Sequence, residues 1–465
     1  MDLLRRPLTE QLDALASGTC SCRELMEATL ARIDATQAKL GAFTWVADHD
    51  ELLEAADAAD AARSGGRARP LEGIPLGVKD LEDVAGVVTS MGSIPFRDNR
   101  AERDSVQVER LRAAGAIVVG KTNTPEFGFT AITKNLLFGV THNPWNLDHT
   151  PGGSSGGSSA AIAGGVVSLA TASDGGGSVR LPASMTGCFG LKPSLGRIPH
   201  ETKLWSMDDT AVFGPLTRSV EDAAIHLDEV VGAHPFDPNS LPHPGLSYRE
   251  ILPNLPSGLR VAYSADLGSA AVQSDIATVV RDAARFFERG HQFREIDGGP
   301  PALGKAWGLG TSFDLAGAIE PLLPEREDDF ARAFLVGIRA ARKMTPTLWG
   351  EIRQERQALN HWCADLFDRF DLLVTPTVPF DPPPARGPFP DSVEGRSVPP
   401  AGVASFTIPF NLSWHPAATV RAGFSRAGLP VGLQIVGPRH RDDLVLQAAY
   451  AFEQAFPWHD DWPEV

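Results

Sequence analysis

Two runs of glycine and serine dominate the first half of this sequence. The first is Pro151-Gly152-Gly153-Ser154-Ser155-Gly156-Gly157-Ser158-Ser159, and the second is Ser173-Asp174-Gly175-Gly176-Gly177-Ser178-Val179-Arg180. The strongly apolar residues 160–172 separate the two runs, and Cys188-Phe189-Gly190-Leu191 follows them. Because core-forming residues enclose both runs, a flexible Gly/Ser linker is disfavoured. Residues 160–172 are instead expected to form a buried helix followed by a strand.

Alternating helix and strand patterns extend outward from these runs. Residues 105–114 have helical spacing and lead into 116–119, an apolar run typical of a buried strand. Further expected elements are a capping-box helix start at Ser21 to Glu24, a helix at 51–63, a strand at 260–263, a helix at 274–289, a helix at 361–370, a strand at 372–374 and a helix at 442–454. This rhythm predicts an α/β fold.

Composition narrows the classes of partner. The net charge of -16 makes the surface repel phosphate backbones, so no nucleic-acid partner is expected. The four cysteines have no zinc-site spacing, and so few in 465 residues suggest a reducing compartment. The start of the chain has no signal-peptide pattern, and residues 160–172 are too short to span a bilayer. We therefore expect a cytoplasmic protein with no membrane partner, no metal and no cofactor.

Two familiar glycine motifs fit the runs poorly. A dinucleotide fingerprint over residues 175–180 would need a third glycine where Arg180 stands, and no P-loop exists because Pro193 follows Lys192. Gly152 to Gly156 matches a Gly-x-Ser-x-Gly nucleophile elbow, but residues 142–150 before it read as a loop rather than the required strand. Both hypotheses remain as weaker alternatives.

A lysine-assisted serine is the third hypothesis. A serine hydroxyl needs a base, and lysine can serve only when burial keeps it uncharged. Lys79 follows Leu76-Gly77-Val78, an apolar and tightly turned context, although alone it would be taken for a surface lysine. Glycines at 175–177 can turn backbone N–H groups toward one point beside Ser178, as an oxyanion hole requires.

Taken together, these motifs resemble the amidase signature family. The matching pieces are Gly77-Val78-Lys79-Asp80, the glycine–serine run from Gly152 to Ser158, and Asp174-x-Gly176-Gly177-Ser178-x-Arg180-x-Pro182-Ala183. Ser154 and Ser178 are 24 positions apart, which is the separation usual in the family. The match covers roughly residues 20–200 and 400–455.

The resemblance implies roles for individual residues. Ser178 would be the nucleophile, Ser154 would bridge it to Lys79 through a hydroxyl that follows a cis peptide bond, and Lys79 would be the base and later the acid. The substrate-binding positions would be Gly175, Gly176 and Gly177, which bind the oxyanion, and Ser155, which joins the hydrogen-bond network. Asp174 and Arg180 would brace the loop as an ion pair.

The resemblance also implies a large mixed β-sheet core covered by α-helices on both sides. We expect a single domain over residues 1–465. It would comprise a helical segment at about 1–65, a signature core at about 70–200, a variable section at about 230–400 that builds the substrate pocket, and a return to the core at about 400–455. Aromatic candidates for the acyl pocket are Trp307, Phe313, Trp349, Phe410 and Trp414.

The implied activity is hydrolysis of small aryl, cyclic or linear non-peptide amides through an acyl-enzyme. Gly175, Leu81 and Trp414 depart from the commonest family pattern and favour this branch. One alternative is a glutamine-hydrolysing subunit of an aminoacyl-tRNA amidotransferase. A non-catalytic binding protein with the same fold is another. The substrate would be a small-molecule amide, and a homodimer is left open.

Overall fold

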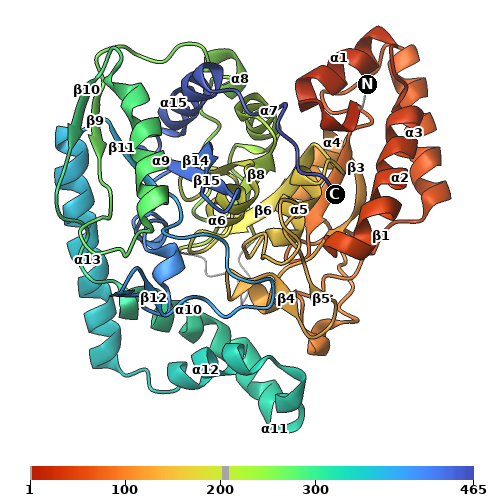
Figure 1. Cartoon of the computed structure of the whole chain (residues 1–465). Helices are drawn as coiled ribbons and strands as arrows, with labels where there is room; N and C mark the ends of the chain where they lie inside the picture. Colours follow the sequence, from red (N-terminus) through yellow and green to blue (C-terminus); the bar gives the residue numbers. More distant parts are fainter. Residues whose placement is uncertain (1–2, 202–208) are drawn as a thin grey trace.

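A mixed β-sheet of eleven strands runs through residues 3–201 and 209–465, the parts of the chain that the computed structural model describes. Figure 1 shows helices packed around this sheet. From edge to edge its strands are β1 (Phe43–Val46), β3 (Ile117–Thr122), β2 (Pro75–Lys79), β6 (Leu169–Asp174), β8 (Val212–Thr217), β7 (Phe189–Lys192), β14 (Ala417–Phe424), β15 (Pro430–Val436), β11 (Leu372–Pro376), β9 (Arg260–Tyr263) and β10 (Gln292–Glu295).

Strand direction alternates through the middle of the sheet and is constant within a parallel group on each side of it. Strands β3, β2 and β6 are mutually parallel at one end, and β11, β9 and β10 are parallel at the other. Every pairing from β6 through β8, β7, β14 and β15 to β11 is antiparallel, and β1 is antiparallel to β3. Two short separate hairpin sheets pair β4 (Lys134–Asn135) with β5 (Gly139–Val140) and β12 (Ser392–Val393) with β13 (Arg396–Ser397). The predicted α/β class and the mixed sheet are confirmed.

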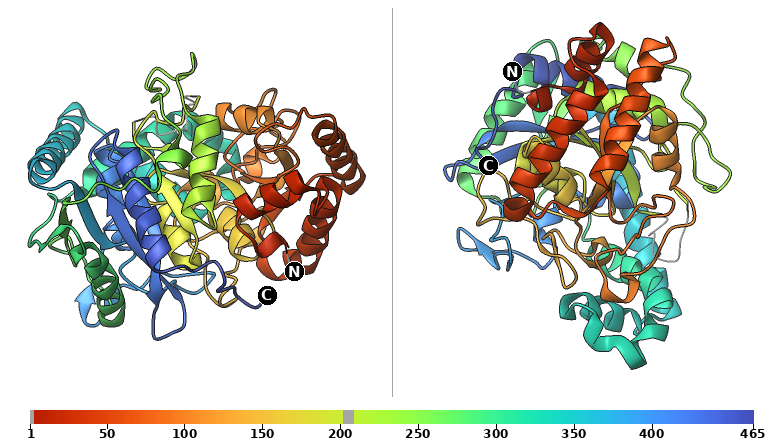
Figure 2. Two further views of the ribbon diagram at one scale, coloured as in Figure 1. Left: turned by 90° about the horizontal axis from the view of Figure 1, so that it is seen from above. Right: turned by 90° about the vertical axis from the view of Figure 1, so that its right-hand side faces the viewer.

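Helices cover both faces of the sheet (Figure 2). They are α1 (Leu8–Ser17), α2 (Cys22–Leu40), α3 (His49–Ser64), α4 (Val106–Ala113), α5 (Gly156–Ala163), α6 (Arg180–Thr186), α7 (Val220–Val230), α8 (Tyr248–Ile251), α9 (Ser274–Ala284), α10 (Gly304–Ile319), α11 (Leu323–Arg326), α12 (Arg332–Ala341), α13 (Pro346–Arg369), α14 (Ile408–Leu412) and α15 (Asp442–Ala455). Helix α5 packs on β2 and β6, and α6 packs on β7 and β15. Helix α7 packs on β8, and α15 packs on β14.

Local sequence signals explain where several elements begin. The Ser21 hydroxyl accepts a hydrogen bond from the Glu24 N–H at 3.0 Å, and Glu24 Oε2 accepts one from the Ser21 N–H at 2.8 Å. This is the predicted capping box, and it starts α2. The apolar residues 160–172 complete α5 and form most of β6, as expected. The predicted helix at 274–289 is α9 continued by a short 3-10 turn.

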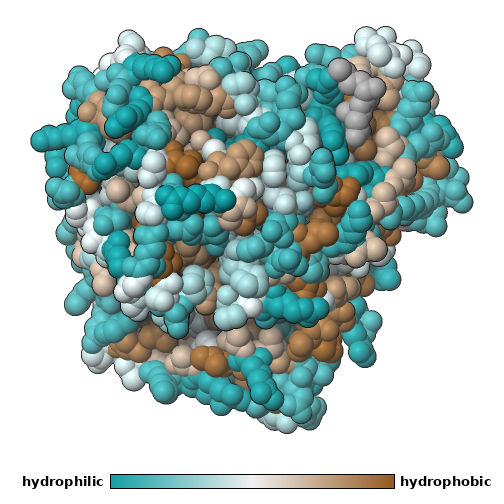
Figure 3. Space-filling model, in the orientation of Figure 1, coloured by the Kyte–Doolittle hydropathy of each residue, from teal (hydrophilic) through white to brown (hydrophobic). Residues whose placement is uncertain are grey.

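The section 230–400 divides into two parts with different surroundings. Strands β9, β10 and β11 belong to the main sheet. Helices α10, α11 and α12 project at the lower end of Figure 1 and form an apolar cluster of their own. The Phe334 ring of α12 stacks on Phe127 at 5.0 Å between centroids and links this cluster to the body. Figure 3 shows a mostly hydrophilic face with apolar patches, some of them near these helices.

Candidate active site

Three neighbouring elements bring the predicted site residues together. Lys79 is the last residue of β2, and Ser173 and Asp174 end the parallel neighbour β6. Because the two strands run in the same direction, their carboxyl ends meet at one edge of the sheet. Ser154 immediately precedes the turn into α5, and Ser178 lies in the connection from β6 to α6.

The amine of Lys79 is fully buried among serine hydroxyls. Its side chain is 0% exposed. Nζ lies 2.8 Å from Oγ of Ser154, 2.8 Å from Oγ of Ser155 and 2.9 Å from Oγ of Ser173. Among the described residues, no carboxylate lies within ion-pairing distance of this amine. A buried amine without a counter-ion favours its uncharged form.

The pKa of Lys79 reflects its burial. Burial lowers the pKa of Lys79 to about 7, although the charges of Glu82 and Asp174 act in the opposite direction. A substantial fraction of the amine is therefore uncharged near neutral pH, which is the state that a base requires.

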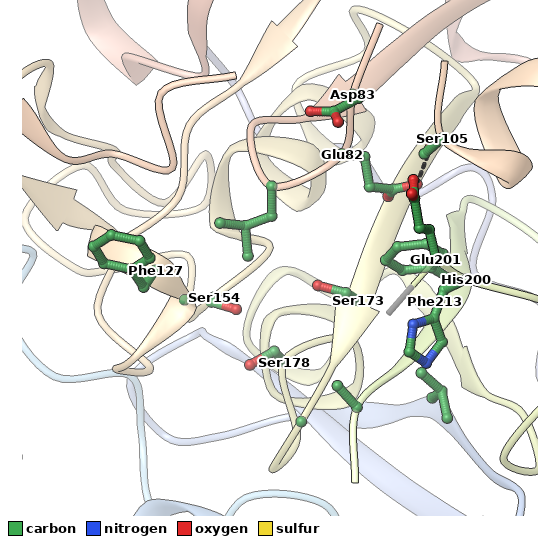
Figure 4. A pocket seen from close by; sticks show the side chains of 15 residues that line it. Glu82, Asp83, Ser105, Phe127, Ser154, Ser173, Ser178, His200, Glu201 and Phe213 are labelled. Atoms are coloured by element: carbon green, nitrogen blue, oxygen red, sulfur yellow. Dashed lines mark hydrogen bonds between the residues drawn. The ribbon is translucent and has the colours of Figure 1, made fainter. Parts of the chain in front are cut away.

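Ser154 and Ser178 face a common pocket. Ser154 is 2% exposed, and the peptide bond from Gly153 to Ser154 is cis, as the resemblance implied. Figure 4 shows both hydroxyls turned into the same space. Ser178 is partly exposed, and its hydroxyl makes no hydrogen bond to any residue in the described part of the chain. Ser178 is therefore the serine of the pair that is free to meet a ligand.

Asp174 and Arg180 form a fully buried ion pair behind the glycine loop. Arg180 Nη2 lies 2.9 Å from Asp174 Oδ1, and both side chains are 0% exposed. Burial opposes the charge on Asp174, but Arg180 holds the pKa of that carboxyl well below its usual range. The carboxylate also accepts hydrogen bonds from the N–H groups of Gly177 at 2.7 Å and Val179 at 3.1 Å. The pair therefore holds the loop on both sides of Ser178.

More distant parts of the chain complete the surroundings of Arg180. Its guanidinium donates to the Thr407 carbonyl at 3.0 Å, to Asn411 Oδ1 at 2.6 Å and to Gln434 Oε1 at 2.8 Å. Helix α14 and strand β15 thus fix a loop more than 200 residues earlier in the sequence. Sequence analysis missed these contacts, and no local pattern signals them.

The three glycines of the loop differ in their surroundings. Gly177 has φ of +133°, which L side chains rarely adopt, and its N–H is already donated to Asp174. A Cβ on Gly176 would lie 2.7 Å from the Trp307 indole. The N–H groups of Gly175, Gly176 and Ser178 make no hydrogen bond to the residues that the structure describes. These three groups, rather than that of Gly177, are the donors left for a ligand.

The pocket is lined entirely from the first half of the chain. Its described lining comprises Leu81, Glu82, Asp83, Ser105, Phe127, Gly128, Ser154, Ser173, Gly175, Ser178, His200, Glu201, Ala211, Val212 and Phe213. This differs from the expectation that residues 230–400 build the pocket. From that section, Trp307 Nε1 donates to the Gly175 carbonyl at 3.0 Å, and Phe334 stacks on the lining residue Phe127. Helix α10 supports the loop from behind instead of lining the cavity.

The other aromatic candidates lie elsewhere. Phe410 is fully buried in the core, and Phe313, Trp349 and Trp414 are each at least 39% exposed. The Trp414 indole donates to the Asp209 carbonyl at 2.6 Å. Phe127 and Phe213 are the phenylalanine rings that line the cavity, and sequence analysis missed both. Phe127 packs on Phe96 and Phe334, and Phe213 lies in β8, so their positions depend on contacts between segments that are distant in the sequence.

Two further polar residues complete the site. Ser155 is fully buried against Lys79 and is absent from the described pocket lining, so it belongs to the hydrogen-bond network rather than to the substrate surface. Ser173 was not predicted as a partner of Lys79. In the sequence, its position beside the second glycine run was the one hint of a role in the site. The contact itself forms between β2 and β6, which a local sequence pattern does not show.

Metal-ligating clusters and membrane spans are both missing from the described residues. No group of three or more His, Cys, Asp or Glu side chains there is arranged to hold a metal ion. No described helix combines the length and apolar character that crossing a membrane requires.

Comparison with known proteins gives a consistent result. The Amidase family model matches residues 24–446. An acylamidase of Rhodococcus erythropolis is 37% identical over 472 residues, 98% of this chain and 96% of that protein. One subunit of the glutamyl-tRNA(Gln) amidotransferase of Roseiflexus sp. (strain RS-1) is 32% identical, with 98% of each chain covered. The crystal structure of a bacterial aryl acylamidase of the amidase signature family has a TM-score of 0.92 and 30% identity, covering 97% of this chain and 96% of that one.

Proposed function

Because this chain belongs to the amidase signature family, we propose that it hydrolyses small non-peptide amides through an acyl-enzyme on Ser178. The chain is an amide hydrolase. The observation that carries the catalytic proposal is the buried Lys79 amine, which is surrounded by three serine hydroxyls and has no carboxylate within ion-pairing distance among the described residues.

The proposed proton transfer follows from this arrangement. Uncharged Lys79 Nζ accepts the hydrogen of the Ser154 hydroxyl, and Ser154 Oγ accepts the hydrogen of Ser178 as Ser178 Oγ attacks the amide carbonyl. The tetrahedral oxyanion is stabilised by the free N–H groups of Gly175, Gly176 and Ser178. As the carbon–nitrogen bond breaks, Lys79 returns a proton through Ser154 to the leaving amine. Water then cleaves the ester on Ser178, and its proton follows the same route.

Aryl amides are the first substrate class to test. The relatives named acylamidase and aryl acylamidase support this choice, and so do the Phe127 and Phe213 rings in the pocket lining. The substrate is a small molecule, and the proposal includes no metal, cofactor or nucleic-acid partner. All four cysteines are free thiols, which supports a cytoplasmic location.

Glutamine hydrolysis for a partner enzyme is the second candidate, because one relative belongs to an amidotransferase. Trp414, at a position where such amidotransferase chains usually have glycine, speaks against it. A rate comparison of 4-nitroacetanilide with glutamine separates the two functions. A preference for glutamine would contradict the aryl amide proposal.

Replacing the nucleophile tests the chemistry. Ser178→Ala is expected to lower kcat for 4-nitroacetanilide at least about 10⁴-fold, while the circular dichroism spectrum stays that of the wild type. A fluorophosphonate should label Ser178 in peptide mapping. A label on Ser154, the central serine of the run from Gly152 to Gly156, or on Ser155, the central serine of the overlapping run from Gly153 to Gly157, would instead favour the nucleophile-elbow hypothesis. Activity retained by Ser178→Ala would contradict the acyl-enzyme.

A further inference from the structure

One carboxyl group in the pocket has no part in the proposed proton transfer. Glu82 lies in the turn that follows β2, where its N–H donates to the Lys79 carbonyl at 2.9 Å. The side chain is 1% exposed and lines the pocket. Its Oε1 atom is buried and makes no hydrogen bond to any described residue. A buried acceptor in this state is costly unless another group supplies a donor.

Buried side chains fix the direction of this carboxyl. Gln107 Nε2 donates to Glu82 Oε2 at 2.8 Å, and the Ser105 hydroxyl lies 3.4 Å from the same oxygen. Gln107 Oε1 in turn lies 3.1 Å from Nε2 of His226, which must donate because an amide oxygen can only accept. Burial lowers the pKa of His226 to about 3, so its ring stays neutral. Gln107 and Ser105 therefore hold the carboxyl group through Oε2, and the Thr171 side chain is its further polar neighbour.

The carboxyl groups in the pocket lining favour a positively charged hydrogen-bond donor for Glu82 Oε1. Glu82, Asp83 and Glu201 contribute three carboxyl groups, and the described lining contains no lysine or arginine. Arg103 already pairs with Glu201. Burial raises the pKa of Glu82 to about 7, although the Thr171 and Gln107 side chains and Lys79 favour the charged form. An approaching cation would therefore complete the ionisation of Glu82 near neutral pH.

We propose that Glu82 Oε1 is a specificity-determining acceptor for a primary ammonium group, so that the preferred amides carry an alkylammonium substituent. The substituent would occupy the side of the pocket near Ser105, away from Phe127 and Ser154 (Figure 4). This inference rests on the proposed function, because it assigns a substrate class to the same pocket. The orientation by Gln107 makes Glu82 a fixed acceptor rather than a mobile surface charge.

Matched substrate pairs test the assignment. One pair places the charge on the acyl side, as 5-aminopentanoyl-4-nitroanilide against hexanoyl-4-nitroanilide. The other places it on the leaving amine, as 4-(aminomethyl)acetanilide against 4-ethylacetanilide. In at least one pair the wild type should prefer the ammonium member at least tenfold in kcat/KM, and Glu82→Gln should lower that ratio at least tenfold.

Glu201→Gln is the matched control, since it removes a lining carboxyl that already has a partner in Arg103. It should change the same ratio less than threefold. An equal loss in both variants would assign the preference to the overall charge of the pocket and overturn the role of Glu82. Ratios within threefold of the wild type for Glu82→Gln in both pairs would also overturn it.

A binding measurement separates this inference from the proposed chemistry. In titration calorimetry, n-hexylammonium chloride should bind the wild type at least tenfold more tightly than 1-hexanol, and Glu82→Gln should lose this preference. Glu82→Met provides the same test if the glutamine variant does not fold. Equal affinities in the wild type would overturn the inference. Failure of the wild type to hydrolyse all four anilides would contradict the proposed function, while calorimetry would still decide the role of Glu82.

Discussion

Two buried lysines on neighbouring strands have opposite surroundings. Lys79 ends β2, and Lys121 lies in β3, where it pairs in register with Val78; both side chains are 0% exposed. Lys121 Nζ lies 3.5 Å from Asp80 Oδ1 and 2.9 Å from the Thr89 hydroxyl. Lys79 meets only hydroxyl and carbonyl oxygens among the described residues.

The comparison shows that burial alone does not make a base. Burial lowers the pKa of both lysines, but Asp80 lies against Lys121 and stabilises its charged form. Lys79 has serine hydroxyls where Lys121 has a carboxylate. Without a carboxylate in ion-pairing distance among the described residues, the Lys79 amine can lose its proton more easily. One lysine is a structural cation and the other is suited to accept a proton.

The largest expected effect is on catalysis. Lys79→Met should lower kcat/KM for 4-nitroacetanilide by about 10³-fold to 10⁴-fold, because Ser154 loses the group that accepts its hydrogen. Steady-state kinetics on protein of verified folding measures this loss. Lys121→Met, with the same change of side chain, should stay within about tenfold of the wild type. Equal losses in the two variants would remove the distinction between the lysines.

The free energy of unfolding should be affected more by Lys121→Met than by Lys79→Met, the reverse of the order expected for activity. Lys121→Met leaves the buried Asp80 carboxyl without its cation and should lower the free energy of unfolding by about 3 to 5 kcal/mol. Lys79→Met leaves no carboxylate unpaired, so its free energy of unfolding should change by less than about 1 kcal/mol. Urea denaturation followed by fluorescence gives both values. A larger loss in Lys79→Met would contradict the comparison.

The pH profile sharpens the case for Lys79. The uncharged amine is the active form and the pKa of Lys79 is about 7, so kcat/KM should fall about tenfold per unit below that pH and level off above it. The negative charge of Glu82 raises the pKa of Lys79, so Glu82→Gln should move this limb to lower pH. A flat wild-type profile between pH 5 and 8, or a limb that disappears in Glu82→Gln, would show that Lys79 is not the titrating base.

The smallest expected effect concerns Ser173. Ser173→Ala removes one of the three hydroxyls around Lys79 Nζ and should lower kcat/KM by about threefold to tenfold, in line with the loss of one hydrogen bond. Ser173→Thr keeps the hydroxyl and should restore most of the activity. An alanine variant as active as the wild type would mean that Ser154 and Ser155 position the amine without help.

The sequence predicts the site better than its surroundings. Lys79, Ser154 and Ser178 could be named because short motifs with fixed spacing carry them, and the ion pair of Asp174 and Arg180 belongs to one of these motifs. Glu82 lies three residues after Lys79 and was still missed. Its orientation depends on Gln107 in helix α4, which no local pattern indicates.

The fold shows the same limit. The start of α2 and both ends of α15 were predicted within a few residues. Strand order was not, because β8 lies between β6 and β7 although it follows both in the sequence. Four-residue strands such as β1 carry too few side chains to reveal their neighbours.

The contacts of Arg180 with residues 407, 411 and 434 can form only after most of the chain has been synthesised. A ribosome produces Lys79, Ser154 and Ser178 more than two hundred residues before these partners. Throughout that interval the nascent polypeptide carries its reactive side chains without the C-terminal support of their loop. Premature stop codons between positions 200 and 400 should therefore yield fragments that contain every reactive group and still cleave nothing.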